Sequence, residues 1–300
     1  RSRTKKIFEI RKNKITMKCK IGVIFFCISL VFCAINAQTD KTVGICLSGG
    51  GALGYAHIGA LQALEEAGIK PNIISANSMG SVIGVFYANG YSPTEMLEVI
   101  RKEKGYRVRS IMDIRAKPKG GYLKHKQLQE VLDKYIHHNS FDSLNIEFYI
   151  CCINIRKAEV KFVGKGNQLK EYVIASSSLP LVYEYSIIDG VEYVDGGLKN
   201  NFPVEPLVDA KCDKIIGINV INFTPADTCI KADELIPNIY AIMDEAINEK
   251  RYQQCDFYIP IKGLNTRRYN MFSYKHYMDI YRLGYENMKK YIEENPEILQ

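Results

Sequence analysis

Hydrophobic residues follow two alternating patterns along most of the chain. From Leu53 to Leu64 they recur at the spacing of an amphipathic helix, and Gly68 and Pro71 follow where that helix should end. Short runs of apolar and β-branched residues, typical of strands buried on both faces, span residues 43–48, 72–77, 147–155 and 214–221. Buried strands that alternate with helices predict an α/β fold with three layers, α/β/α, around a mainly parallel central sheet. Ligands bind at the carboxyl ends of the strands in such sheets.

The positive charge of the chain is concentrated at its N-terminus. Residues 1–37 contain nine of the 40 Lys and Arg residues and one of the 33 acidic residues, which leaves 31 basic and 32 acidic residues for the rest. The rest of the chain therefore has no overall charge that favours nucleic acid as a partner. Its hydrophobic content of 47% is enough for a large core, and one domain is the simplest expectation.

The same N-terminal stretch has the pattern of a secretory signal. A basic start at Met17 precedes an apolar run over residues 21–33, and Ala34 and Ala37 are small residues of the kind found at cleavage sites. We expect residues 1–37 to be an upstream extension plus a signal peptide, and residues 38–300 to form a single domain.

Cleavage near Ala37 predicts export to the periplasm, the outer membrane or the medium. The alternative is a retained membrane anchor, although the apolar run is shorter than the roughly 20 residues that a spanning helix needs. Six cysteines lie beyond this leader, in a spacing that matches neither a disulfide framework nor a zinc site. We expect no metal, and most of these thiols to be buried as small hydrophobic groups: Cys46, Cys151, Cys152, Cys212, Cys229 and Cys255.

A glycine-rich loop follows the first predicted strand. Gly49, Gly50 and Gly51 precede the first helix, where several backbone N–H groups can converge at the positive end of the helix dipole and bind an anion. A dinucleotide site would need an acidic residue after the next strand, and a phosphate-binding P-loop would need Lys-Ser or Lys-Thr after Gly54. The chain has Tyr55 after Gly54 and Ser78 after the next strand, so we expect no nucleotide.

Ser78 lies between the second predicted strand and a helix rich in small residues. The stretch Ala76-Asn77-Ser78-Met79-Gly80 is G-x-S-x-G with alanine in place of the first glycine, a pattern typical of a nucleophile elbow. Such a turn strains the serine backbone and exposes the hydroxyl. Small residues at 80, 84 and 88 would let the helix pack closely on the sheet. The alternative is that Ser78 only caps the helix.

A nucleophilic serine needs a base, which is usually histidine. None of the histidines is flanked by a strand-end loop of small residues; they are His57, His125, His137, His138 and His276. Asp195 has such a loop, because Gly196 and Gly197 follow it and let the backbone turn sharply away from the carboxylate. By itself, Asp-Gly-Gly is also an ordinary turn.

In this order, the glycine loop, the serine turn and Asp-Gly-Gly resemble the patatin-like phospholipase family, and in particular its bacterial, secreted members. The segment Ala175–Tyr185 is also similar to the family's Ala-Ser-x-x-x-Pro motif. The resemblance implies a serine lipid acyl hydrolase, a phospholipase A or carboxylic ester hydrolase of lipid degradation, that needs no cofactor. It assigns Ser78 as nucleophile and Asp195 as general base. It assigns the oxyanion hole to Gly49, Gly50 and Gly51, with supporting motif positions Gly54, Ala76, Met79, Gly80, Gly196 and Gly197.

The chain departs from the family pattern at two positions. Leu53 stands where the family often has Arg or Lys, and Ala76 stands where it has Gly. These departures keep open the alternative of a catalytically impaired, patatin-shaped protein that only binds lipid.

The substrate is expected to be a lipid or another ester. Residues 101–126 hold ten Lys or Arg and two acidic residues, which is consistent with anionic headgroups at a membrane surface. A solvated basic loop explains the same pattern equally well. Met112, Ile114 and Tyr122 are candidates for a flap over an acyl-binding groove.

Overall fold

The computed structural model describes residues 41–105, 121–222, 232–266 and 268–300. The predicted leader with its cleavage site, together with Met112 and Ile114 of the predicted flap, lies outside these residues. Everything below concerns the unit Thr42–Gln300.

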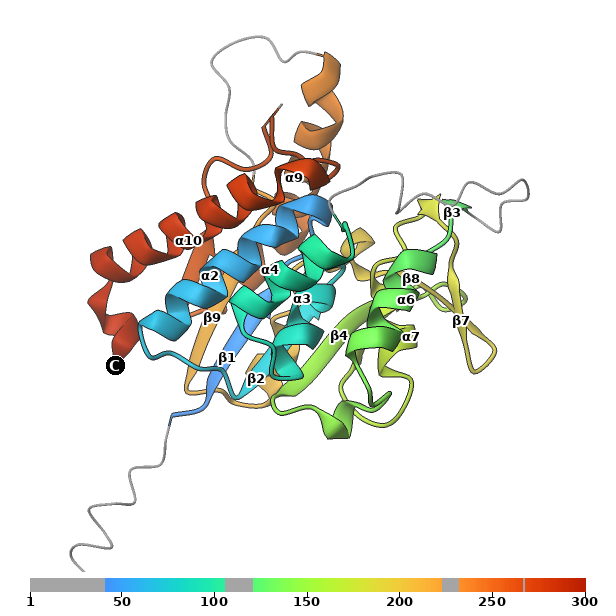
Figure 1. The fold of residues 1–300 in the computed structure, drawn as a ribbon, viewed down its shortest axis with the longest axis horizontal. Coiled ribbons are helices and arrows are strands. Elements are labelled where there is room, and N and C mark those ends of the chain that lie inside the picture. The colour runs from blue at the N-terminus through green and yellow to red at the C-terminus, as the bar shows by residue number, and fades with distance from the viewer. Residues whose placement is uncertain (1–40, 106–120, 223–231, 267) are drawn as a thin grey trace, which may run out of the picture. The chain divides into compact units, whose positions relative to one another are not determined.

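An eight-stranded sheet forms the centre of this unit, and its strands include the four predicted from the sequence (Figure 1). The order along its main path is β10 (Phe257–Pro260), β9 (Lys214–Asn219), β1 (Val43–Leu47), β2 (Ile73–Asn77), β4 (Glu147–Asn154), β8 (Val191–Asp195) and β7 (Ser186–Ile188), and β5 (Glu159–Val163) pairs with β4. From β10 to β4 every pairing is parallel, whereas β5, β8 and β7 pair antiparallel. A separate parallel pair joins β3 (Gly121–Leu123) to β6 (Leu181–Tyr183).

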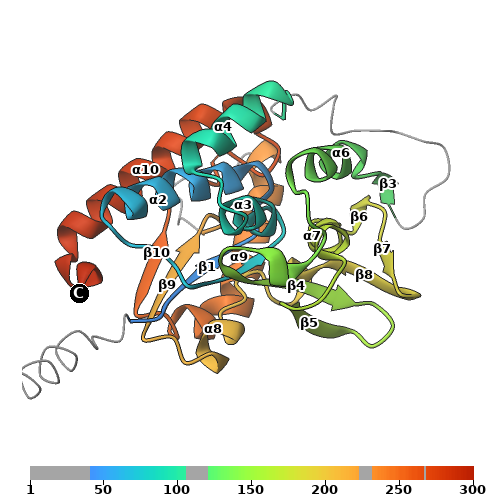
Figure 2. The same cartoon turned by 60° about the horizontal axis from the view of Figure 1, so that its bottom comes forward.

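Helices cover both faces of the sheet, which confirms the predicted three-layer arrangement. In Figures 1 and 2, α2, α3, α4 and α10 lie on one face, and α8 lies on the other. No helix within the described ranges is both long enough and apolar enough to cross a membrane. The helices are α2 (Tyr55–Glu66), α3 (Met79–Ala88), α4 (Pro93–Lys102), α6 (Lys126–Tyr135), α7 (Leu169–Ser176), α8 (Glu205–Asp209), α9 (Ala232–Tyr252) and α10 (Tyr277–Glu294), with short 3₁₀ turns η1 (Gly51–Gly54), η2 (Phe141–Ser143), η3 (Gly196–Leu198), η4 (Tyr274–His276) and η5 (Pro296–Leu299).

Helix α3 packs on the sheet through the small residues that the sequence indicated. A Cβ atom added to Gly80 would lie 2.5 Å from Ser48 O, and one added to Gly84 would lie 2.7 Å from Phe148 Cε2. Larger residues at these positions would push the helix off β1 and β4. The close approach therefore sets the position of the first turn of α3, which follows Ser78.

A two-residue turn joins β7 to β8. Asp189 and Gly190 have φ angles of 49° and 74°, and Ile188 pairs with Val191 on either side of them. Two consecutive residues with positive φ are typical of a type I′ hairpin, for which Asp-Gly is a favoured sequence. Strand β8 runs from this turn to Asp195.

The cysteines in the described part of the chain are free thiols. Cys46, Cys151 and Cys152 are buried, as predicted, whereas Cys212 and Cys255 are half-buried. Burial raises the pKa of the Cys46 and Cys151 thiols well above its ordinary range. Cys229 lies outside the described residues.

Candidate active site

Ser78 occupies a sharp turn between β2 and α3. Its φ of 50° and ψ of −125° are unusual for a residue with a side chain, and such a backbone typically costs about 1–3 kcal/mol. The side chain makes no capping hydrogen bond to α3, so the hydroxyl does not have the alternative role of a helix cap. The turn has the strain expected of a nucleophile elbow.

Hydrogen bonds to the Ser78 backbone hold this turn. Ser78 N donates to Ser176 Oγ at 2.8 Å, and Ser78 O accepts from the amides of Ser81 and Val82 at 2.9 and 3.2 Å. Ser176 belongs to the predicted Ala-Ser-x-x-x-Pro segment, which thus supports the turn from α7.

Asp195 lies at the end of β8, with 3% of its surface exposed. Its carboxylate accepts hydrogen bonds from Asn77 Nδ2 at 2.9 Å and from Gly197 N at 2.8 Å. Burial raises the pKa of Asp195 above its ordinary value, although these two hydrogen bonds and the nearby Ser78 side chain lower it. A carboxylate with a raised pKa is a stronger base than a free aspartate.

Strand register brings Ser78 and Asp195 together across an intervening strand. Asn77 of β2 pairs with Cys151 of β4, and Asp195 of β8 pairs with Cys152 of the same strand. Because β8 is antiparallel to β4, it reaches this point from the direction opposite to β2. The site therefore lies where two strands end beside the middle of a third, rather than at one row of parallel strand ends.

Two asparagines and a second buried carboxylate extend the contacts of Asp195. Asn77 Nδ2 also donates to Asn201 Oδ1 at 3.0 Å. The Asn201 side chain contacts Asp244 of α9, which also accepts from Tyr252 OH at 2.7 Å. Burial raises the pKa of Asp244 from its ordinary value of 3.8 to about 6. These partners were not predicted; the asparagine pair 200–201, directly after Asp-Gly-Gly, is the only sign of them in the sequence.

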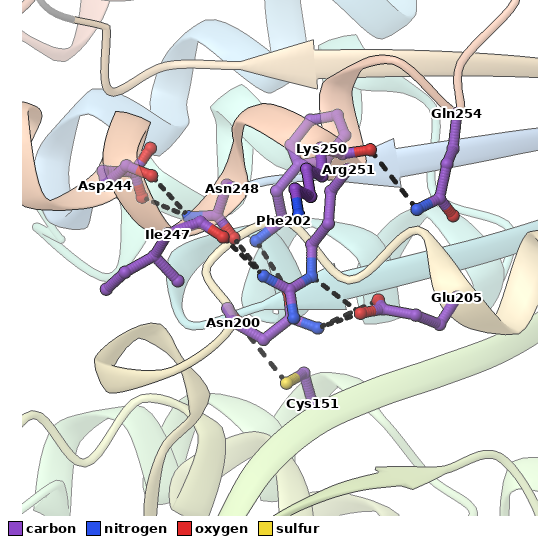
Figure 3. A network of polar contacts seen from close by, with 10 residues as sticks. All are labelled: Cys151, Asn200, Phe202, Glu205, Asp244, Ile247, Asn248, Lys250, Arg251 and Gln254. Atoms are coloured by element: carbon purple, nitrogen blue, oxygen red, sulfur yellow. Dashed lines mark hydrogen bonds and ion pairs between the residues drawn. The ribbon is translucent and has the colours of Figure 1, made fainter.

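A neighbouring network ties the loop after Asp195 to α8 and α9 (Figure 3). Arg251 Nε donates to Glu205 Oε1 at 2.7 Å, and the same carboxylate accepts from Asn200 Nδ2 at 2.9 Å. Cys151 Sγ lies 3.5 Å from Asn200 O, which links the loop to β4. Asn248, which contacts Arg251, also donates to Asp244 Oδ1.

The glycine loop passes directly beside Ser78. A Cβ atom on Gly49 would collide with Asn201 Oδ1 and lie 2.9 Å from Ser78 Cβ. Gly49 N already donates to Asn201 O at 3.2 Å, so this predicted oxyanion donor is engaged within the fold. Gly50 and Gly51 line the cavity at Ser78, and their amides have no hydrogen-bond acceptor in the part of the chain that the structure describes.

The other motif positions support packing around the turn. Gly54 leaves room for the Met79 side chain, which a Cβ atom there would strike. Leu53 is fully buried in the core, so this departure from the family pattern is an apolar packing residue. Ala76 is a buried residue of β2 that pairs with Leu47 and Ile150. Gly196 packs against Asn77 and Cys151, where a side chain would not fit.

Ser78 and Asp195 line a cavity of about 280 Å³ whose other walls are mostly apolar. Residues of α3, α4, α6 and α9 contribute to the lining, together with residues 271–272. Leu198, Tyr240, Met243 and Phe272 line the cavity and are also exposed. The serine hydroxyl is therefore reached through an apolar surface.

None of the histidines hydrogen-bonds to Ser78 or Asp195. His57 is fully buried in α2 and lies 2.9 Å from Ser48 O. His125 lines the cavity, which was not predicted; it lies 3.0 Å from Ser177 O and stacks on Tyr183. Burial lowers the pKa of both imidazoles to about 4. Among the residues described, no group of three or more His, Cys, Asp or Glu is placed to hold a metal ion.

The family model described as patatin-like phospholipase matches residues 45–208, more than half of the chain. The chain belongs to this family. The matched patatin-like segment contains Ser78, Asp195 and the glycine loop, whereas α9 with Asp244 lies beyond it.

Curated relatives of this patatin-like chain include fungal lysophospholipases. Lysophospholipase NTE1 of Coccidioides immitis is 32% identical over 183 residues, and lysophospholipase nte1 of Neurospora crassa is 29% identical over 183 residues. Each match covers 60% of this chain and 12% of the relative, so the chain spans only a small part of their length. The predicted bacterial, secreted branch of the family stays a prediction.

Solved structures with a similar fold are more distant in sequence. VipD from Legionella pneumophila has a TM-score of 0.46 and 14% identity, over 81% of this chain and 67% of that one. Human GIVD cytosolic phospholipase A2 has a TM-score of 0.40 and 12% identity, over 87% of this chain and 58% of that one.

Proposed function

We propose that the protein is a serine lipid acyl hydrolase of the phospholipase or lysophospholipase type, with Ser78 as nucleophile and Asp195 as general base. One observation carries this proposal: the Ser78 hydroxyl contacts the buried Asp195 carboxylate instead of capping α3, and both groups line an apolar cavity. Membership in the patatin-like phospholipase family and the names of the fungal relatives support a lipid ester as substrate.

In the proposed reaction, Ser78 Oγ attacks the acyl carbonyl carbon as its proton passes to Asp195. The carbonyl oxygen becomes an oxyanion that accepts hydrogen bonds from Gly50 N and Gly51 N, each worth about 10²–10³ in rate. When the intermediate collapses, the bond to the leaving oxygen breaks and Asp195 returns the proton to that oxygen. Water, deprotonated by Asp195, then attacks the acyl carbon of the acyl-serine; the bond to Ser78 Oγ breaks, Asp195 returns the proton to Ser78 Oγ, and the fatty acid is released.

The raised pKa of Asp195 makes this dyad chemically reasonable. A free carboxylate is a weak base toward an alcohol, whereas burial without a paired cation makes the charged form less stable and more ready to take a proton. The hydrogen bonds from Asn77 Nδ2 and Gly197 N act in the opposite direction to burial and lower the pKa of Asp195.

We further propose that the enzyme takes its substrate from a lipid surface. Four exposed apolar residues rim the cavity, and they would contact acyl chains when the mouth faces a membrane or micelle: Leu198, Tyr240, Met243 and Phe272. Faster hydrolysis of phospholipid in vesicles than of the same lipid below its critical concentration would support this part of the proposal.

A fluorophosphonate probe tests the catalytic assignment. Wild type should be labelled, and Ser78→Ala should lose labelling and release of fatty acid. Ser143→Ala is the matched control, because Ser143 is an exposed residue of η2. Absence of labelling in folded wild type would favour the alternative of a lipid-binding protein without catalysis.

Export of the chain is a separate proposal, supported by the signal-like pattern before Ala37. Expression of the full chain in a bacterial host, followed by N-terminal sequencing of the exported fraction, should give a new terminus near Gln38. An intact leader on membrane-bound protein would support the anchor instead.

A further inference from the structure

The part of the cavity between α3, α4 and α6 has the composition of a binding site for a hydrocarbon chain. We call this part the acyl arm; it is lined by Val82 and Phe86 of α3, Met96 and Val99 of α4, and Leu128 and Val131 of α6. The same three helices lie near one another in Figures 1 and 2. These six side chains favour the transfer of apolar surface from water, while Glu103 and Gln127 are polar residues that also line the cavity beside α4 and α6.

The acyl arm begins at Ser78 because of how α3 is oriented. Gly80 and Gly84 press one face of the helix on the sheet, so the larger residues at 82 and 86 lie on other faces and reach the cavity. Val82 and Phe86 are four residues apart and thus follow one another along the same side of the helix. A chain bonded to Ser78 can therefore extend along α3.

Phe86 lies about two helical turns beyond Ser78 on the side of α3 that lines the acyl arm, and it is firmly supported. Its ring, 5% exposed, packs against the rings of Tyr91 and Tyr135 at centroid distances of 5.3 and 6.3 Å, and neither tyrosine lines the cavity. Tyr91 OH donates to Tyr135 O at 2.9 Å, and Tyr135 OH donates to Glu103 Oε1 at 2.6 Å. These bonds hold both tyrosines behind Phe86, so its ring has little room to move aside.

The distance from Ser78 to Phe86 limits the length of chain that fits. Eight residues of α-helix rise about 12 Å. With carbon–carbon bonds of about 1.5 Å, an extended hydrocarbon chain advances roughly 1.25 Å per carbon. A straight acyl chain of about ten carbons therefore spans the acyl arm from the ester carbon to the Phe86 ring.

We propose that the acyl arm binds the acyl chain of the substrate and that Phe86 sets the longest chain that lies straight in it, at about ten carbons. This inference rests on the proposed hydrolase function. Because each buried methylene contributes about 0.8 kcal/mol, kcat/KM should rise about fourfold per carbon up to this length and then level off or fall.

Hydrolysis of p-nitrophenyl esters with four to sixteen carbons, in mixed micelles of constant composition, tests the proposal. Wild type should prefer about ten carbons. Phe86→Ala removes the ring and opens about one helical turn, or four carbons, so its ratio of kcat/KM for fourteen over ten carbons should rise at least tenfold.

A second variant tests the same idea in the opposite direction and does not depend on a cavity-forming change. Val82→Phe places a ring in the middle of the acyl arm, so the preferred length should shorten to about six carbons or fewer. Tyr87→Ala is the matched control, because Tyr87 is a buried aromatic residue of the same helix that does not line the cavity. Its chain-length preference should match that of wild type.

The outcomes separate this inference from the function on which it rests. Opposite shifts in the two variants, with no shift in the control, support Phe86 as the limit. Active enzyme whose length preference is the same in wild type, Phe86→Ala and Val82→Phe overturns the inference and leaves the hydrolase intact. No ester hydrolysis by folded wild type, with no labelling of Ser78, overturns both.

Discussion

Ser78 is held through its own backbone, whereas Asp195 is held by side chains from distant parts of the chain. The Ser78 turn depends on a positive φ, on small residues in the next helix, on carbonyl bonds to the first turn of that helix, and on one distant partner, Ser176 Oγ, which accepts from the Ser78 amide. Asp195 depends on Asn77, then Asn201, then Asp244 on α9. We call the Ser78 turn with the start of α3 the serine half of the site, and Asp195 with Asn77, Asn201 and Asp244 the aspartate half. The serine half should be sensitive to substitutions that crowd the backbone, and the aspartate half to substitutions that remove a hydrogen bond.

The largest expected effect comes from Asp195→Asn. The amide cannot accept the serine proton, so kcat should fall by about 10³-fold or more. Stability should be unchanged or higher, because the change removes a buried carboxylate whose burial opposes its charge. Kinetics and denaturant unfolding measure the two quantities, with Asp209→Asn on the exposed end of α8 as control. A fall in activity that only follows a fall in stability would contradict a base role.

Lowering the pH should remove the same base gradually. The pKa of Asp195 is raised, so its carboxylate protonates at a higher pH than a free aspartate would, and protonated Asp195 cannot accept the serine proton. Plotted against pH, kcat/KM should fall tenfold per unit below a midpoint that lies above 3.8, the ordinary value for aspartate. An acid limb centred below this value would mean that another group limits the reaction.

Gly80→Ala should disturb the serine half of the site only through a steric clash with the backbone of a neighbouring segment. The new methyl group would lie 2.5 Å from Ser48 O, a backbone atom that cannot move aside cheaply. We expect a loss of about 1–3 kcal/mol in stability and a fall in kcat of about tenfold or more, since the first turn of α3 must shift. Gly84→Ala, which meets the Phe148 ring one turn later, is the control and should lose stability with less effect on kcat.

Asp244→Asn should damage the aspartate half at a distance. An amide at 244 no longer selects the orientation of the Asn201 side chain, so Asn77 is held less firmly and kcat should fall up to about tenfold with little change in KM. Glu245→Gln, an exposed neighbour on α9, is the control. If Asp244→Asn and wild type have equal kcat, Asp244 does not help to position Asp195.

Asp244→Asn should also change how the free energy of unfolding depends on pH. The folded-state pKa of Asp244, about 6, exceeds its ordinary value of 3.8, so the favourable contribution is complete below pH 3.8 and is lost as pH rises through 6. This loss is about 3 kcal/mol in wild type and should be absent in the variant. The difference in unfolding free energy between the two proteins, measured from pH 4 to 7, shows it directly.

Ala76→Gly should have the smallest effect. Ala76 is an ordinary buried strand residue, so glycine removes one methyl group and adds backbone freedom, at a cost of about 1 kcal/mol or less. Activity should stay within about threefold of wild type or rise. A large loss of activity would show that the serine turn depends on this methyl group.

The Ser78 turn was predictable from sequence because most of its determinants are local, apart from the hydrogen bond to Ser176 of α7. Residues 76–80 match the G-x-S-x-G pattern except that alanine replaces the first glycine. Small residues follow at positions 84 and 88, as a close turn from strand to helix requires. Asp195 was also found locally, through the glycines after it. The layers and the parallel centre of the sheet followed from the apolar runs.

The partners of the aspartate were missed because the asparagine pair 200–201 is the only sign of them in the sequence, and that sign is weak. Asn201 is 124 residues from Asn77, and an asparagine in a loop or an aspartate in an amphipathic helix reads as an ordinary polar residue until the fold brings them together. The antiparallel direction of β8 and the place of His125 in the cavity depend likewise on contacts between distant segments. Gly49 looked equivalent to Gly50 and Gly51, and only the Asn201 carbonyl distinguishes it.

The hairpin turn at Asp189-Gly190 helps to set the register of β8 and therefore the direction in which the Asp195 side chain points. Side chains alternate between the two faces of a strand, so slipping β8 by one residue would place Val194 where Asp195 now lies. An inserted or deleted residue in this turn that shifts the register of β8 by one would turn the Asp195 side chain to the other face of the strand, while leaving every residue of the candidate site in the sequence. The length of this turn therefore sets which residue of β8 lies beside Ser78.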